Sequence, residues 1–207
     1  LVGETMSKTI SSKDRATCLL FGDAGSATLI EKNEKYGKSY FSLNSDGSGS
    51  SVLKIPAGGY RTPSSDETVK DKEYSDGSIR SEEQLYMDGM EVFNFTMRVV
   101  PKDIRKILES TERTQEDIDF LIFHQANKYM TDYLAKKAKF PLEKVPYSLD
   151  KYGNTSGVTI PLTIVSELVD KAPLNSKMLL SGFGAGLSWG SAIIDFNNCY
   201  ISKITKV

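Results

Sequence analysis

The apolar and polar positions along the first half of the chain predict strands, loops and one long helix. Residues 16–32, ATCLLFGDAGSATLIEK, are two apolar runs separated by a turn sequence and predict a β-hairpin or strand-turn-strand unit. Residues 37–80 are rich in Gly, Ser, Asp and Lys, which is typical of surface loop. From residue 82 to about residue 108, apolar residues recur every three or four positions and predict a helix, with a kink or break expected at Pro101.

The second half alternates between strand-like and helix-like patterns more sharply. DIDFLIF, residues 117–123, predicts a short buried strand, and the residues after it place apolar side chains on one helical stripe. A further helix is expected at about 155–170, with Asn154 or Thr155 as its cap. Residues 177–196, KMLLSGFGAGLSWGSAIIDF, predict two strands joined by a glycine-rich turn. Strands that alternate with helices and end as a pair predict a layered α/β fold.

The composition of the 207 residues is that of an ordinary globular protein, with 39% apolar and 26% charged residues. A net charge of −1 argues against a general nucleic-acid binder, and no apolar run approaches the ~18 residues of a membrane span. Cys18 and Cys199 lack metal-ligand spacing, so we expect no metal and two reduced, buried thiols of a cytoplasmic protein. The chain begins LVGETMSKTI, without an initiator methionine, and is interpreted as a segment of a longer protein.

Three short stretches each follow an apolar run, where side chains can converge: HQAN (124–127), GNTSG (153–157) and GFGAGLSWG (182–190). His124, the one histidine, precedes Asn154 by 30 positions, about the length of a helix-plus-strand unit. Adjacent parallel strands are therefore expected to bring the two residues together. A neutral imidazole N–H and an amide N–H could both donate to one oxygen and stabilise an enolate on a thioester carbonyl.

Each of these stretches is weak evidence when it is taken alone. GNTSG is more often an ordinary turn with a helix cap, GFGAG could be only a tight strand connection, and a lone histidine is about as often a structural residue. The dinucleotide-binding fingerprint fails, because its last glycine falls on Leu187 or on Trp189.

Five stretches carry a resemblance when they are read together and in order: FGDAGSATLI, MDGMEVFNFTMR, HQAN, YGNTSGVTIP and GFGAGLSWGSAII. They resemble the C-terminal half of the β-ketoacyl-acyl-carrier-protein synthase III family, in the thiolase superfamily, over essentially the whole chain. The resemblance implies a thiolase-like, layered αβα fold that is one half of a duplicated architecture. Residues 1–80 would end the preceding half, and residues 81–207 would form the C-terminal catalytic domain.

The resemblance also implies an acyltransferase that starts type II fatty acid synthesis. In the family, a cysteine takes an acyl group from acyl-coenzyme A. Malonyl on acyl carrier protein then loses carbon dioxide, and the resulting enolate attacks the acyl-cysteine. By similarity, His124 and Asn154 would stabilise that enolate. The family's cysteine would lie upstream of Leu1, so we expect the chain alone to be inactive. Apart from the substrates, no cofactor is implied, and the family works as a homodimer in the cytoplasm.

The glycine-rich turn would border the same site in the family. Phe183 and Gly184 would line it, and the backbone N–H of Ala185, where glycine is common, would stabilise the oxyanion of the acyl-enzyme step.

The surface for the carrier protein departs from the family pattern. Asn94 and Tyr129 stand where the family often has a lysine and an arginine. The remaining basic candidates lie on two predicted helices: Arg98, Lys128, Lys136, Lys137 and Lys139. If one helix continues through residue 139, Lys136 lies about 80° and Lys139 about 20° from Lys128, so these three share one sector.

Two alternatives to the leading interpretation stay open. The chain could come from a homologous condensing enzyme of polyketide or other secondary metabolism, with a different acyl primer. It could also come from a non-catalytic thiolase-fold partner, although such partners commonly lose the histidine or asparagine that this chain keeps at His124 and Asn154.

Overall fold

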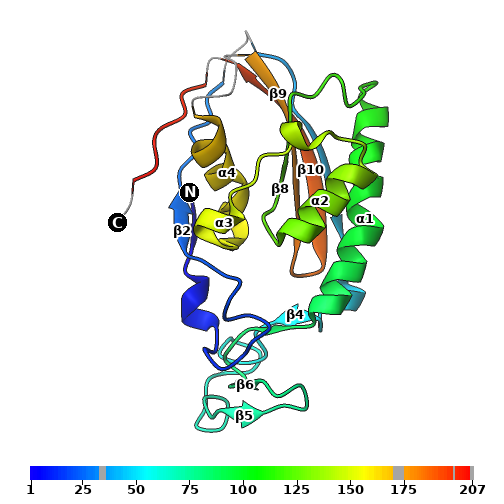
Figure 1. The fold of residues 1–207 in the computed structure, drawn as a ribbon. Coiled ribbons are helices and arrows are strands. Elements are labelled where there is room, and N and C mark those ends of the chain that lie inside the picture. Colours follow the sequence, from blue (N-terminus) through cyan, green and yellow to red (C-terminus); the bar gives the residue numbers. More distant parts are fainter. Residues whose placement is uncertain (33–35, 170–174, 198, 206–207) are drawn as a thin grey trace.

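A computed structural model describes residues 1–32, 36–169, 175–197 and 199–205 (Figure 1). Its centre is a four-stranded sheet in the order β3-β10-β9-β8. The strands are β3 (Tyr40–Ser45), β8 (Phe120–Phe123), β9 (Asn175–Gly184) and β10 (Ser188–Asn197). Strand β8 runs parallel to β9, whereas β10 is antiparallel to both β9 and β3.

Helices cover both faces of this sheet, which gives the αβα layers that the sequence predicted. In Figure 1, α1 (Gly89–Ser110) and α2 (Lys128–Lys137) lie on one side of the sheet, and α3 (Leu149–Tyr152) and α4 (Thr159–Leu168) lie on the other. Single 3-10 turns complete the helical elements: η1 (Met6–Thr9), η2 (Gly47–Gly49), η3 (Leu142–Lys144) and η4 (Ser156–Val158).

Strand β8 shows why both faces need cover. Its alternate residues Leu121 and Phe123 belong to the core cluster that contains the buried side chains of α1 and α2. Ile122 points the other way and packs with Leu168 and Met178 on the α4 side. All three β8 residues are fully buried, so the strand is apolar at consecutive positions rather than alternating.

The long helix was predicted to start earlier than it does and to kink or break at Pro101; the break is absent. Helix α1 begins after Asp88, whose side chain accepts hydrogen bonds from the N–H groups of Met90 and Glu91. Pro101 is buried inside the helix, which continues to Ser110. A break at Pro101 is therefore wrong, because packing on the sheet outweighs the ~3 kcal/mol that an interior proline costs a helix.

The prediction of loop for residues 37–80 is wrong at β3. This strand was missed because polar side chains lie on its face toward α1: Ser42 and Asn44 donate hydrogen bonds to the buried Asp103 of α1 at 2.5 and 2.9 Å. Ser191 of β10 donates to the same carboxylate at 2.7 Å. After β3 come β4 (Leu53–Lys54) paired with β7 (Tyr86–Met87), and β5 (Lys72–Glu73) paired with β6 (Ile79–Arg80).

The predicted hairpin at residues 16–32 is also wrong. Residues 15–20 form turns, and β2 (Ala24–Ser26) pairs with β1 (Val2–Glu4) instead of with a neighbouring strand. Cys18 therefore lies in a turn and is only partly buried, and Cys199 is exposed, so the expectation of two buried thiols is corrected. Both are free, and no described helix is long and apolar enough to cross a membrane.

The division into residues 1–80 and 81–207 stays a prediction. Strand β3, from the first segment, pairs with β10 of the second.

Candidate active site

The backbone of His124 continues the central sheet by one residue beyond β8. Its N–H donates to the carbonyl of Ser181 on β9 at 2.8 Å. Its ring lies edge-on to the ring of Phe183, with 5.3 Å between centroids. The parallel pairing of β8 and β9 thus brings together two of the residues predicted for the site.

Asn154 reaches the site by a different route from the one predicted. It follows α3 and Gly153, which has a φ of +69°, and it forms an isolated parallel bridge with Phe21. Its N–H donates to Leu20 O at 2.9 Å, and its carbonyl accepts from Gly22 N at 3.0 Å. The expectation of adjacent parallel strands ending at His124 and Asn154 is wrong, because β9 is the parallel neighbour of β8 and the loop at 20–22 holds Asn154.

Ser156 connects the two predicted donors. Asn154 Oδ1 accepts a hydrogen bond from Ser156 N–H at 2.9 Å, and the Ser156 carbonyl lies 2.9 Å from Thr159 Oγ1, which is itself 2.7 Å from Nδ1 of the His124 ring. Because Asn154 is 5% exposed and its side-chain oxygen is engaged, its amide NH₂ is left as the group that can donate to a ligand.

The capping prediction holds only in part. Thr155 is the N-cap of the 3-10 turn η4 but makes no capping bond with its side chain, whereas Asn154, one residue earlier, accepts from Ser156 N–H; α4 starts after Val158 and has no side-chain cap.

Desolvation dominates the electrostatics of His124. The side chain keeps some accessible surface, but the surrounding protein lowers the pKa of the imidazole from 6.5 to about 4. The backbone of Ser156 beside the ring favours the charged form, which opposes this shift of the pKa and offsets it only in part. The ring is therefore neutral at pH 7, which agrees with a hydrogen-bond donor that is not an ion.

Thr159, the first residue of α4, is a site residue that the sequence did not reveal. Its Oγ1 lies 2.7 Å from His124 Nδ1, and it is 2% exposed. Nothing in the sequence separated this threonine from other residues in the first turn of a helix.

The turn between β9 and β10 carries the remaining predicted residues. Gly184 ends β9, and Ala185 is exposed at the tip of the turn. Gly186 has a φ of +132°, and the buried Leu187 exchanges two backbone hydrogen bonds with Asp46, at 2.8 and 3.1 Å. An open cavity of about 620 Å³ adjoins the turn, with apolar walls. The roles of Phe183, Gly184 and Ala185 stay predictions.

The basic side chains of α2 differ in whether their charged groups already contact other side chains. Lys128 is paired with Asp132 at 3.0 Å, and its ammonium lies 5.0 Å from the centre of the Tyr147 ring. Lys137 lies over the Tyr133 ring at 5.4 Å, and Lys136 is exposed.

Lys139 lies outside the helix. It follows the C-cap Ala138 and has a φ of +61°. Placing Lys139 in one helical sector with Lys128 and Lys136 is therefore wrong.

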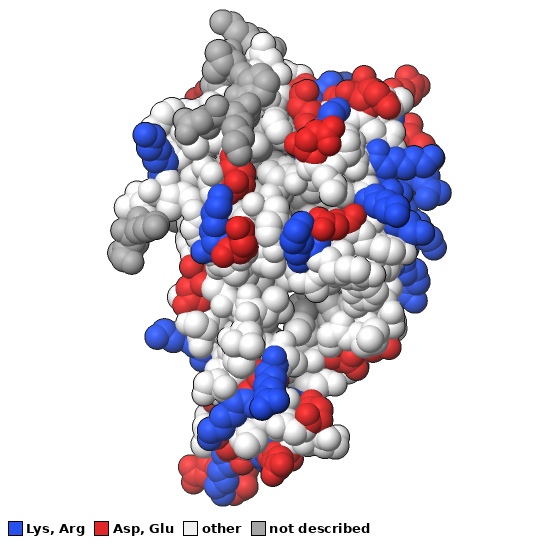
Figure 2. Space-filling view, in the orientation of Figure 1, with Lys and Arg blue, Asp and Glu red and all other residues white. Residues whose placement is uncertain are grey.

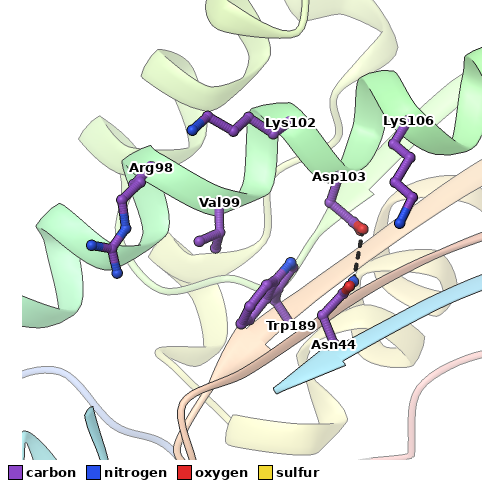
Figure 3. Close-up of a pocket in the computed structure, with 7 residues that line it drawn as sticks. All are labelled: Asn44, Arg98, Val99, Lys102, Asp103, Lys106 and Trp189. Carbon is purple, nitrogen blue, oxygen red and sulfur yellow. Dashed lines mark hydrogen bonds between the residues drawn. The ribbon is translucent and has the colours of Figure 1, made fainter. Parts of the chain in front are cut away.

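Arg98 belongs to a second basic surface, on α1. It lines a cavity of about 280 Å³ with Lys102, Lys106 and Trp189, in which all three basic side chains come from successive turns of the same helix (Figure 3). Figure 2 shows Lys and Arg gathered on the side of the molecule where α1 lies. The two helices meet where Phe93 stacks on Tyr129, with 6.0 Å between ring centroids.

Comparison with known families identifies the same type of protein twice. Residues 1–49 match the family model of 3-oxoacyl-[acyl-carrier-protein (ACP)] synthase III, and residues 108–196 match the model of its C-terminal part. A curated relative from Campylobacter jejuni is 40% identical over 205 residues, which are 99% of this chain and 57% of the relative. The β-ketoacyl-[acyl-carrier-protein] synthase III of Desulfitobacterium hafniense Y51 is 38% identical, over 94% of this chain and 57% of its own. The chain thus spans just over half the length of these relatives.

Solved structures agree with the sequence comparisons. The 3-oxoacyl-(acyl-carrier protein) synthase from Burkholderia xenovorans LB400 superimposes with a TM-score of 0.82 and 39% identity, over 98% of this chain and 57% of that one. The priming β-ketosynthase of the R1128 polyketide pathway gives a TM-score of 0.72 and 28% identity, over 94% and 55%.

Proposed function

Because the chain belongs to the 3-oxoacyl-[acyl-carrier-protein] synthase III family, we propose that it carries the decarboxylation half of a condensing active site. The substrates are malonyl on acyl carrier protein and an acyl group delivered from acyl-coenzyme A. The product opens type II fatty acid synthesis. The observation that supports this best is the pair of donors, His124 and Asn154, which Ser156 joins through its N–H to Asn154 and through its carbonyl to the Thr159 hydroxyl beside the His124 ring.

In the proposed reaction, the bond between the malonyl Cα and its carboxylate breaks, and carbon dioxide leaves. The electron pair moves onto the thioester carbonyl oxygen, which becomes an enolate. His124 and Asn154 donate to that oxygen, and partial burial strengthens both bonds relative to water. The enolate carbon then attacks the acyl thioester on the catalytic cysteine, a new carbon–carbon bond forms and the thiolate leaves. The N–H of Ala185 stabilises the oxyanion of the acyl step.

The test uses the synthase that contains this chain. His124→Ala and Asn154→Ala should each lower malonyl decarboxylation by on the order of 10²–10³-fold, because each removes one donor to the enolate. Acylation of the cysteine should fall far less. Asn175→Ala is the matched control, since Asn175 is an exposed asparagine at the start of β9. Normal decarboxylation by either single variant would show that the residue does not have this role.

A condensing enzyme of secondary metabolism is the second candidate. The similarity to the R1128 priming β-ketosynthase favours it as an alternative. The same chemistry at His124 and Asn154 serves both candidates, so the primer distinguishes them. A panel of acyl-coenzyme A primers and carrier proteins, assayed for ketoacyl product, tests the choice. A non-catalytic partner subunit would give no decarboxylation at all.

The partners that we propose are acyl carrier protein, acyl-coenzyme A and, in a cytoplasmic homodimer, a second subunit. The carrier protein would bind the basic side chains of α1 and α2. Lys136 and Arg98 are better candidates than Lys128, which is already paired with Asp132. Lys136→Glu with Arg98→Glu should lower kcat/KM for malonyl on its carrier, more at low salt than at high salt, and leave malonyl-coenzyme A unaffected. An equal effect on both substrates would exclude these residues from docking.

A further inference from the structure

The hydroxyl of Thr159 lies between two groups that compete for its proton. Its Oγ1 is 2.7 Å from His124 Nδ1 and 2.9 Å from the carbonyl oxygen of Ser156. A threonine hydroxyl has one proton, so it can donate to only one of these groups at a time. Because Thr159 is 2% exposed, this choice is made away from bulk water.

The choice fixes the tautomer of the imidazole. When the hydroxyl donates to Ser156 O, Nδ1 must carry the ring proton and donate to Oγ1, so Nε2 has a bare lone pair. When the hydroxyl donates to Nδ1, the proton of the neutral ring is on Nε2. Only the second arrangement presents an N–H to a substrate oxygen on the Nε2 side.

We propose that Thr159 is a positioning residue that keeps the ring proton of His124 on Nε2 by donating its hydroxyl to Nδ1. The contact to the ring nitrogen is the shorter of the two, and an sp² imidazole nitrogen is a stronger acceptor than a backbone carbonyl. This assignment rests on the proposed function in one respect, because it explains how His124 presents the N–H that donates to the enolate.

A second layer of buried groups fixes the threonine itself. Thr163 Oγ1, one turn further along α4, donates to the carbonyl of Thr159 at 2.8 Å and contacts Ser148 Oγ at 2.7 Å. The N–H of Ser148 donates to Gln125 Oε1 at 3.1 Å, which links the network back to the residue after His124. Thr163, Ser148 and Gln125 are all at most 2% exposed, so α4 holds Thr159 in a rigid position.

The single histidine of the chain makes the test direct. With ¹⁵N-labelled imidazole, the protonated and unprotonated ring nitrogens have well-separated NMR shifts, and one residue gives one pair of signals. The wild-type chain should show a protonated Nε2. Thr159→Val keeps the shape but removes the hydroxyl, so Nδ1 loses its donor and the Ser156 carbonyl, which bonded to the same hydroxyl, is the acceptor left on that side of the ring. A carbonyl can only accept, so the proton should move to Nδ1.

Two further variants complete the design. Thr159→Ser restores a hydroxyl at the same atom and should return the proton to Nε2. Thr96→Val removes a buried hydroxyl from α1, which donates to the Val92 carbonyl at 2.8 Å and takes no part in the Thr159 network, and it should leave the wild-type tautomer. Thermal unfolding shows whether each variant is folded. If Thr159→Val does not fold, the comparison of Thr159→Ser with wild type still tests the assignment.

An Nδ1–H tautomer in the wild type, or the same tautomer in wild type and Thr159→Val, would overturn the assignment. Decarboxylation by the synthase separates this result from a failure of the proposed function. With the donor role intact, Thr159→Val should decarboxylate on the order of 10²-fold more slowly, as for the loss of one donor. A changed tautomer with unchanged decarboxylation would support the role of Thr159 and overturn the donor role of His124.

Discussion

A single methyl group added at Gly22 should displace Asn154, although the two residues are far apart in the sequence. A Cβ at Gly22 would lie 3.2 Å from the carbonyl carbon of Tyr152, and its carbonyl oxygen would be closer still. Real Cβ atoms do not approach backbone to that extent, so one of the two segments must move. The same two segments are joined by hydrogen bonds from Gly22 N to Asn154 O and from Asn154 N to Leu20 O.

The loss of stability in Gly22→Ala can be worked out from those hydrogen bonds. Each backbone hydrogen bond contributes about 1 kcal/mol net, and a buried group left without a partner costs about 1–3 kcal/mol. Gly22→Ala should therefore lower the free energy of unfolding by about 3 kcal/mol. For a chain of this size, that corresponds to a fall in Tm of roughly 6–12 °C. Decarboxylation by the synthase should fall as well, since Asn154 loses its position.

The assay is thermal and urea unfolding of Gly22→Ala beside Gly3→Ala. A Cβ at Gly3 meets nothing within 4 Å, so the control should stay within about 0.5 kcal/mol of wild type. Equal stabilities for the two variants would refute the close approach of residues 20–22 to residues 152–155. The backbone N–H of Asn154 supplies a local readout, because its hydrogen exchange should accelerate in Gly22→Ala alone.

Three further changes test other parts of the structure. Lys139→Gly should raise stability by about 0.5–1 kcal/mol in urea unfolding, because φ is +61° there, whereas Lys136→Gly, inside α2, should lower it by a similar amount. Asp103→Ala should lower the free energy of unfolding by about 2–4 kcal/mol, because it removes the carboxylate to which three side chains of β3 and β10 donate, and the exposed Asp66→Ala should cost little. His124 should titrate near pH 4 by NMR. Since that pKa is below the 6.5 of the unfolded chain, the His124 contribution to stability is complete above pH 6.5 and declines as the pH falls toward 4, and a midpoint at 6.5 would contradict burial of the ring.

The parts of the fold that the sequence predicted are those whose inward side chains are apolar. Strand β8 is a continuous apolar run because both of its faces are buried, and the apolar residues of β9, β10 and α1 likewise fall where the core needs them. Strand β3 was not predicted because the side chains that it turns toward α1 include the polar Ser42 and Asn44. These two donate to the buried Asp103, which is about 60 positions away in the sequence. A pattern of polarity cannot predict a buried carboxylate that accepts from a strand.

The candidate site also has one part that the sequence predicts and another part that it does not. His124 could be predicted because an apolar strand ends at it, and the sheet then carries its backbone to Ser181. The position of Asn154 depends on residues 20–22, and the proton of His124 depends on Thr159. Both relations join segments whose separation in the sequence carries no period, so only the folded structure shows them.

Different segments of the chain hold the two donors, His124 and Asn154, in position. The loop at residues 20–22 holds Asn154, whereas α4 holds the ring of His124 through Thr159, and Ser156 is their common neighbour. Gly22→Ala should therefore weaken one donor and Thr159→Val the other. If both donors serve one enolate oxygen, the combined variant should lose less decarboxylation than the two single losses predict, because the second donor no longer meets a well-placed oxygen. If the losses simply add, the two side chains act at different atoms, and Asn154 must bind another part of the substrate.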